Sequence, residues 1–227
     1  MDSSPRALRA MLTEGSVIVF SILLAFSLDA WWDTARERRE IGETLIALES
    51  EFSEVEVELA RSLDRNESVV TASDQVLQLM REGRGEVGAA VLGEVLRVPT
   101  TAAPEGALAA LISSGRLSQI SSQALRALLA GWSSVLNDVR EEESSAERFV
   151  YEELIPHLTE FTEIGPALYA RLDVPSEGTI TLPLTIRTRN LIEMRRFHSL
   201  NVIRERDRVG VEEHLAEILQ LLRAEIR

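Results

Sequence analysis

The sequence contains neither cysteine nor lysine. Without cysteine there is no disulfide, thiolate nucleophile, iron–sulfur cluster or cysteine-ligated zinc. Without lysine there is no P-loop phosphate contact, Schiff base or Ser-Lys dyad, and arginine is the only permanent side-chain cation. Glycine and proline are also scarce, with 12 and 7 copies in 227 residues. This composition excludes several enzyme classes and argues against a disordered or fibrous chain.

Acidic side chains outnumber basic ones by 37 to 24, which gives a net charge of −13. Nucleic-acid phosphates repel a protein of this charge, so we expect no nucleic-acid partner. The length fits one large domain or two small ones and does not choose between them.

One segment near the N-terminus is apolar enough for a membrane. Residues 15–28 carry no charge, but these 14 residues rise only about 21 Å as a helix, against roughly 30 Å for a hydrocarbon core. Apolar flanks lengthen the segment, and paired tryptophans are typical of the membrane interface. We therefore predict a tail at 1–14, a transmembrane helix at 15–32 and an acidic helical domain at 33–227. The predicted anchor and interface residues are Glu14, Phe20, Phe26, Asp29, Trp31 and Trp32.

Two other interpretations of this segment stay open, a cleaved signal peptide and a buried helix of a soluble protein. Arg6 and Arg9 precede the apolar run as in a signal peptide, but residues 28–30 lack a small-x-small cleavage pattern. Arginines flank both ends of the run equally, so the positive-inside rule does not fix the orientation. A short tail before a large domain favours a bacterial inner-membrane protein with a periplasmic C-terminal domain.

Two apolar seams predict a pair of long helices. The first seam steps by 4, 3, 4, 3 and 4 and leads into an acidic outer face, so this helix is expected to continue from the membrane. The second lies in residues 187–227, which carry nine arginines against seven acidic residues. We expect the C-terminal helix to pack along the acidic one, with Arg204 and Arg206 contributing to the pairing. The seams are Ile41, Leu45, Leu48, Phe52, Val55 and Leu59, and Val211, Leu215, Ile218, Leu222 and Ile226.

The remaining pattern also indicates an all-α fold, an antiparallel bundle of long helices. Ser122 is the expected N-cap of a helix that ends near residue 161, with a kink at Pro156. Residues 179–182 alternate like a strand, but they are interpreted as a loop because nothing nearby pairs with them. The other expected segments are helices at 67–82, 89–97 and 105–113, a turn at 83–88, a break at 99–104 and an irregular stretch at 165–183.

Two stretches resemble a known group. The run Leu28-Asp-Ala-Trp-Trp-Asp33, followed by Arg-Glu-Arg-Arg at 36–39, resembles the start of an abundant group of uncharacterised bacterial single-pass membrane proteins. Residues 111–117 and 125–132 are similar to a recurring element of that group. The resemblance covers about residues 1–65 and 105–143 and implies an anchor followed by a helical domain. It implies no reaction, because the group has none assigned.

Individual motifs offer little chemistry. Residues 83–88 match G-x-G-x-x-G, but a dinucleotide site needs a strand before the motif and a parallel sheet, so an interhelical turn is predicted. The three histidines form no metal-binding motif, and we expect neither metal nor cofactor. A pairing of Glu153 with His157 is conceivable at i and i+4. The run Glu141–Glu143 is interpreted as a solvated face, and Trp132 as a buried bundle residue or else a partner contact.

Three function classes remain. The favoured one is a non-enzymatic accessory subunit, anchored in the lipid bilayer and packed against a larger photosynthetic, respiratory or envelope complex. Its expected partner contacts are Arg36, Arg38, Arg39 and Trp132. The second is an extracytoplasmic sensory or ligand-binding bundle, although a small-molecule ligand is not expected under the first class. The third is an enzyme, for which the sequence offers no convergent catalytic set.

Overall fold

The computed structural model describes residues 5–227, with side chains described from residue 20 onward except those of Ile22 and Thr34. Residues 1–4 and the side chain of Glu14 therefore lie outside what the structure describes. The described chain is almost entirely helical, with one small two-stranded sheet. The predicted all-α bundle is confirmed.

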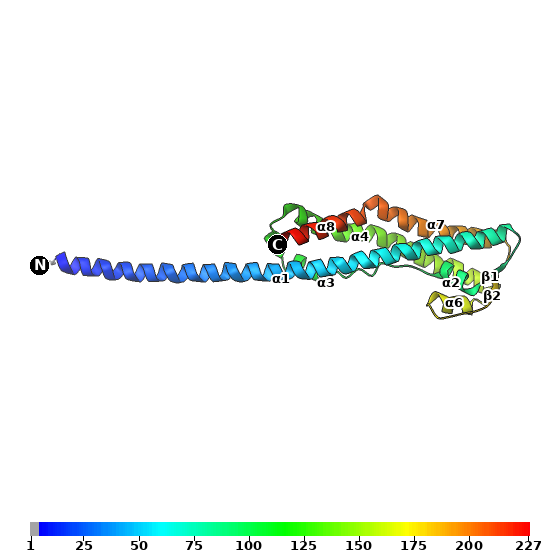
Figure 1. Ribbon diagram of the computed structural model, residues 1–227, viewed down its shortest axis with the longest axis horizontal. Helices are drawn as coiled ribbons and strands as arrows, with labels where there is room; N and C mark the ends of the chain where they lie inside the picture. The colour runs from blue at the N-terminus through cyan, green and yellow to red at the C-terminus, as the bar shows by residue number, and fades with distance from the viewer. Residues whose placement is uncertain (1–4) are drawn as a thin grey trace.

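Helix α1 (Pro5–Arg81) is a single helix of 77 residues, about 115 Å long at 1.5 Å per residue. Its first half projects from the bundle as a stalk, and its second half forms one wall of the bundle (Figure 1). The helix predicted at 67–82 is the end of α1 and not a separate element. No glycine or proline occurs between residues 43 and 82, so nothing in the sequence interrupts it.

The far end of the bundle holds four short elements, of which only the helix expected at 89–97 was predicted from the sequence. Strand β1 (Glu86–Gly88) leads into helix α2 (Ala89–Leu96), and helix α6 (Gly165–Arg171) precedes strand β2 (Thr179–Thr181). The strands are antiparallel, with Val87 opposite Ile180. The loop interpretation of 179–182 was therefore wrong, because the partner strand lies more than ninety residues earlier, inside the predicted turn. The stretch 165–183 also contains α6 and is not wholly irregular.

The middle of the chain forms the rest of the bundle. Helix α3 (Gly106–Ser113) and the 3-10 turn η1 (Arg116–Gln119) lie where α1 enters the bundle, and helix α4 (Gln123–Phe149) runs from there to the far end (Figure 1). The Ser122 hydroxyl accepts a hydrogen bond from the Leu125 amide at 3.2 Å, which confirms the predicted N-cap. In place of a simple kink at Pro156, the chain widens into a π-turn, η2 (Val150–Leu154), followed by α5 (Ile155–Thr159). A wider turn accommodates a residue that has no amide hydrogen to donate.

The chain returns through helices α7 (Ile186–Val209) and α8 (Val211–Glu225), both packed against α1. Arg196 of α7 pairs with Asp74 at 2.7 Å, and Arg223 of α8 pairs with Glu49 at 3.0 Å. The order of these contacts makes the return antiparallel and confirms the packing of the basic segment on the acidic helix. The prediction that Arg204 and Arg206 contribute to this pairing was wrong, however. Arg206 is buried and binds Glu212 of α8, and Arg204 faces solvent because it lies on the outer side of α7.

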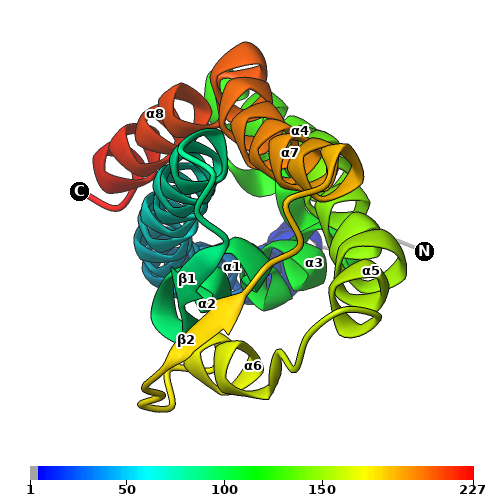
Figure 2. The same ribbon diagram turned by 90° about the vertical axis from the view of Figure 1, so that its right-hand side faces the viewer.

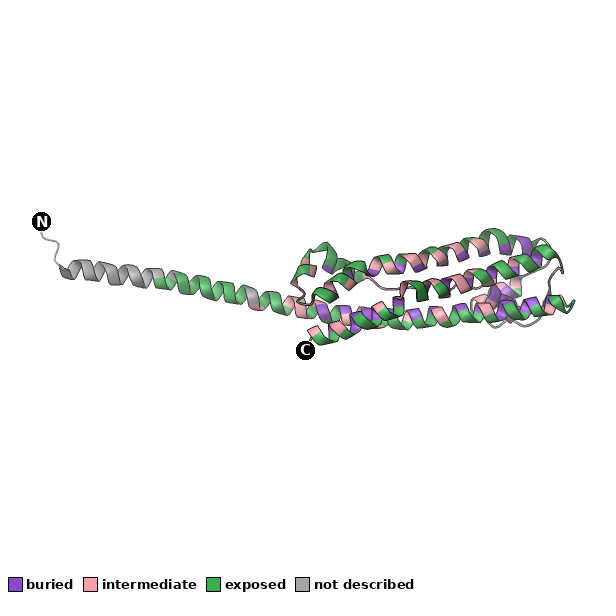
Figure 3. Cartoon of the chain, turned by 90° about the horizontal axis from the view of Figure 1, so that it is seen from above, coloured by how far each residue is buried: buried purple, intermediate pink, exposed green. Residues whose placement is uncertain are grey.

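The interior contains two apolar clusters, one at each end of the bundle. Buried residues occur along the whole bundle, whereas the stalk is exposed (Figure 3). The cluster near the stalk contains most of both predicted seams, and in it Trp132 packs edge-on against Phe52 with ring centres 5.3 Å apart. Trp132 is only 1% exposed, so it is a core residue and not a partner contact. Between the clusters lies a layer of buried polar side chains, namely Ser62, Asn66, Glu143, Arg195, Ser199 and Arg206.

Two histidines lie in or beside the far cluster. The Nε2 atom of His157 is 3.0 Å from the Thr188 hydroxyl, so the Glu153 pairing considered from the sequence is replaced by a contact with α7. Burial lowers the pKa of His157, and nearby Arg187 lowers it further. Burial also lowers the pKa of His198, which lies 5.0 Å from the Phe149 ring and is further affected by Arg195. Both imidazoles are therefore harder to protonate in the folded chain than in the unfolded one.

These shifts predict that the protein loses stability in mild acid. Because the unfolded chain binds protons more tightly at both histidines, lowering the pH favours unfolding. The stability that the two neutral histidines contribute is fully present above about pH 6.5. It is lost as the pH falls towards their lowered pKa values. Urea unfolding between pH 7.5 and 5.5 measures the effect, and the variant His157→Gln/His198→Phe should show a shallower pH dependence. Identical slopes for the two proteins would contradict this explanation.

Candidate functional site

The stalk carries the predicted anchor residues with no part of the bundle against them. Phe20, Phe26, Trp31 and Trp32 are each about two-thirds exposed, and Asp29 is exposed beside them. The two tryptophan rings lie edge to face, with centres 6.5 Å apart. Over the described residues, no helix reaches both the length and the apolar character needed to cross a membrane.

The arginines predicted to contact a partner lie just below the bundle. Arg36 pairs with Glu40 at 2.9 Å, whereas Arg38 and Arg39 are exposed and form no ion pair within the described part of the chain. Glu40 also lies 3.4 Å from Arg116 on η1. The upper end of the stalk and the segment around residue 116 therefore lie against each other at the base of the bundle.

A concave surface lies at the opposite end of the bundle. It is a groove of about 870 Å³ between α1, α2 and the segment that follows α6. Figure 2 shows α2, α6 and the strands together on the side of the bundle opposite α7. Small apolar residues line the groove, namely Ala72, Ala90, Val91, Ala170, Val174 and Pro175. Five carboxylates also line it, from Asp64, Glu67, Glu94, Asp173 and Glu177.

One wall of the groove depends on close packing of α2 against α6 at Gly93. A Cβ atom at this position would lie 2.8 Å from the Ala170 Cβ and 2.9 Å from the Ala167 carbonyl oxygen. Both distances are too short for a side chain, so the absence of one lets the two helices approach. Gly93 therefore fixes the position of α6 and of the segment that follows it.

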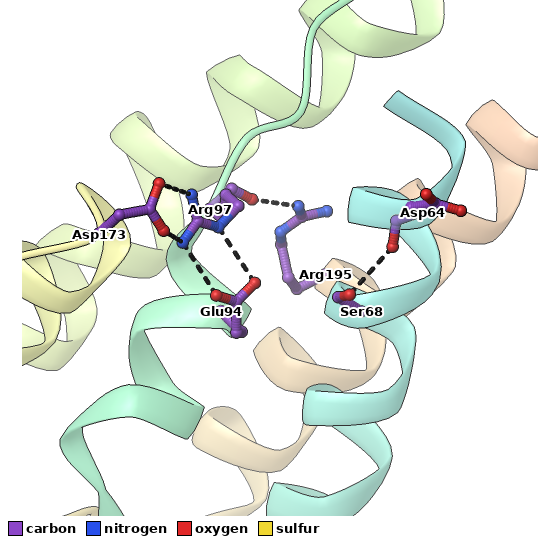
Figure 4. Close-up of polar contacts among 6 residues, drawn as sticks. All are labelled: Asp64, Ser68, Glu94, Arg97, Asp173 and Arg195. Carbon is purple, nitrogen blue, oxygen red and sulfur yellow. Dashed lines mark hydrogen bonds and ion pairs between the residues drawn. The ribbon is translucent and has the colours of Figure 1, made fainter. Parts of the chain in front are cut away.

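Arg97 holds the lip of the groove together (Figure 4). Its Nε and Nη2 atoms donate to Glu94 at 3.0 and 2.9 Å, and Nη2 also donates to Asp173 at 2.7 Å. Hydrogen bonding to Glu94 raises the pKa of Arg97, and hydrogen bonding to Arg97 lowers the pKa of Asp173. Asp173 has a φ of +60°, a strained value found at no other non-glycine residue in the described range. The ion pair holds this strained residue, and with it the lip, in place.

Behind the lip, Arg195 holds the carboxyl end of α2. Its Nε and Nη2 atoms donate to the carbonyl oxygens of Val95 at 3.0 Å and Arg97 at 2.5 Å, and Nη1 donates to Ser199 at 2.9 Å. No carboxylate pairs with this fully buried guanidinium within residues 20–227. Burial lowers its pKa to about 10, so the charge persists at neutral pH. The partial negative charge at a helix carboxyl end favours a cation there.

Three of the groove carboxylates have no cation of their own. Asp64, Glu67 and Glu177 form no ion pair with any described residue, and the first two are exposed along one face of α1. The neighbouring cations are Arg97, which is already bound, and Arg65, which lies close enough to lower the pKa of Asp173. The groove therefore combines an apolar lining with an excess of carboxylates over nearby arginines.

The other sequence motifs form no chemical site. Residues 83–88 form a turn that continues into strand β1, so the predicted interhelical turn is confirmed in part, and the sheet found among the described residues is the antiparallel pair β1 and β2. Glu143 was wrongly assigned to a solvated face, since it is buried and accepts hydrogen bonds from the amide and hydroxyl of Thr101. Among the side chains that the structure describes, no group of three or more histidines and carboxylates could hold a metal ion.

The sequence did not predict the groove. The pair Glu94 and Arg97 was visible as an i, i+3 charge pair, but nothing near it pointed to Asp173, which is 76 residues later. No family model, curated protein or solved structure matches the chain.

Replacing Gly93 tests the packing of α2 on α6. We expect Gly93→Ala to lower the free energy of unfolding by about 1–3 kcal/mol, because the new methyl group forces the helices apart. The matched control is Gly131→Ala on α4, where a Cβ atom meets nothing within 4 Å. It should stabilise the protein by up to about 1 kcal/mol through helix propensity alone. Urea unfolding measures both, and stabilisation by both variants would contradict the packing role.

Replacing Arg195 tests the attachment of α2. Arg195→Met leaves the buried carbonyls of Val95 and Arg97 without donors, so we expect a loss of about 2–4 kcal/mol in urea unfolding. Arg204→Met, on the exposed side of the same helix, should change stability by less than about 0.5 kcal/mol. Equal effects of the two substitutions would show that the carbonyl contacts contribute little.

Proposed function

We propose that this chain is a non-enzymatic accessory subunit, anchored by residues 15–32 in a bacterial inner membrane, that packs against a larger membrane protein complex. In this proposal the bundle lies outside the cytoplasm, and the stalk holds it at a set distance from the bilayer. The exposed Arg36, Arg38 and Arg39 lie between the anchor and the bundle, where a neighbouring subunit could contact them.

The observation that carries the proposal is the continuity of α1. One helix contains the apolar run, the tryptophan pair and the wall of the bundle, without a break between residues 5 and 81. A flexible tether would need only a linker, whereas an unbroken helix also sets the direction of the bundle. The exposed aromatic and aliphatic side chains of residues 20–32 support an apolar environment around this part of the stalk.

Extraction of membranes with alkaline carbonate tests the anchor. The full chain should stay in the membrane pellet, whereas Leu23→Asp/Leu24→Asp should move to the supernatant. Each aspartate costs about 2.5–3.5 kcal/mol at the centre of a membrane helix. The control Ile46→Asp/Val57→Asp places the same charges on exposed positions of α1 within the bundle and should leave the chain in the pellet. Release of the unmodified chain would rule out the anchor.

The absence of cysteine gives a direct test of orientation and assembly. Ser144 is exposed on α4, so Ser144→Cys creates a single thiol that a membrane-impermeant maleimide should label in intact spheroplasts. Labelling only after lysis would place the bundle in the cytoplasm. After mild-detergent extraction the chain should elute with companion membrane proteins, and elution as an isolated monomer would contradict the subunit role.

A further inference from the structure

The far groove has the dimensions of a short extended peptide. Its α1 side runs from Asp64 to Gln75, which is about 17 Å along the helix. An extended chain covers this length with about five residues. The opposite side is the segment 173–177, held in place by Arg97 and by the contact of α6 with Gly93. One wall is thus a helix of the bundle, and the other is tied to α2 through Arg97 and through the packing of α6 on Gly93.

The charge of the groove selects a cationic occupant. Carboxylates stand on both walls, Asp64 and Glu67 on α1 and Glu177 opposite them, and no arginine lines the groove. Between these walls the lining is apolar, with Ala72, Val91 and other small side chains. An extended strand in which basic and apolar residues alternate matches both features, because its apolar side chains face the lining while its long basic side chains, on the solvent side, reach the exposed carboxylates.

Two exposed arginines of the stalk, Arg38 and Arg39, do not reach the groove of a second copy. Arg38 and Arg39 lie on α1 about 38 Å from Asp64 along the helix axis, at the opposite end of the bundle. Copies mounted in parallel on one membrane would keep these positions apart. A cationic segment of a different protein avoids this restriction.

We propose that this groove binds a short extended segment of a partner protein in which basic and apolar residues alternate. The inference rests on the proposed role as an accessory subunit, for which it names the chemistry of one docking contact. The carboxylates orient the bound segment and speed its association, and the apolar lining buries the side chains that lie between the basic ones. Arg97 holds the lip of the groove against the segment.

Fluorescence anisotropy with the full chain in neutral detergent tests the proposal. The probe is a labelled peptide of alternating arginine and leucine, and it should bind saturably and more weakly as salt is raised. Asp64→Asn/Glu67→Gln/Glu177→Gln should weaken binding about tenfold, as expected for the loss of three partly exposed charge contacts. These carboxylates form no ion pair, so circular dichroism and the melting temperature should stay unchanged.

The matched control removes the same net charge elsewhere. Glu43→Gln/Glu56→Gln/Glu217→Gln changes three exposed carboxylates outside the groove and should alter binding less than twofold. A second variant, Ala90→Phe, fills the groove without changing its charge and should also weaken binding about tenfold if the leucines enter it. Ala90 is exposed on α2, so the larger ring should not disturb the core.

Each alternative occupant of the groove gives a distinct experimental result, and any of these results would overturn the proposal. Equal weakening by both triple variants would mean general attraction to a negative protein. Full competition by spermine, with no effect of Ala90→Phe, would indicate a small polyamine. Self-association of the chain that the groove variant abolishes would indicate a second copy. Carbonate extraction reports the anchor separately, so loss of peptide binding with membrane retention intact would reject the groove proposal alone.

Discussion

Helix α1 is the constraint on which the rest of the structure depends, because it lines both apolar clusters of the bundle. Leu48 and Phe52 belong to the cluster near the stalk, and Val76 and Met80 belong to the far one. Helices α7 and α8 return along it, and α2 and α3 pack on it as well. Since side chains on one helix keep fixed angular positions, the rotation of α1 at the stalk determines which way the far groove faces. Any body attached to the stalk therefore meets the groove in one orientation.

The buried polar layer between the clusters fixes how the other helices align along α1. Apolar surfaces alone tolerate sliding, whereas hydrogen bonds with specific partners do not. Glu143 of α4 binds Thr101, and Arg195 of α7 binds two carbonyls at the end of α2, so these elements have one register. The layer also contains groups with no partner in the described structure, Ser62 Oγ and Arg206 Nη1. Such burial costs stability, so the layer is better explained by specificity of alignment than by strength.

Features governed by local periodicity could be predicted from the sequence, and features governed by distant contacts could not. The seam from Ile41 to Leu59 and the N-cap at Ser122 follow from spacing and residue type, and both are present. Strand β2 was not predicted because its partner strand lies more than ninety residues away in the sequence. The groove was not predicted because it depends on Asp173 and Arg97, which are 76 residues apart. The pairing of the C-terminal arginines with α1 was right as a charge argument. The arginines chosen for this pairing were wrong because a small error in the assumed rotation of a helix changes which arginine faces the neighbouring helix.

The excess negative charge of the chain is neutralised to different extents along the fold. Near the stalk, Glu51 accepts hydrogen bonds from the amides of Ala107 and Leu108 at the start of α3, where a helix favours negative charge. Glu49 is paired with Arg223, so the C-terminal segment compensates this part of α1. At the far end the same helix presents Asp64 and Glu67, which form no ion pair with any described residue. The negative charge is thus neutralised by internal ion pairs at the base and remains in excess at the groove, which is why the occupant proposed for the groove is cationic.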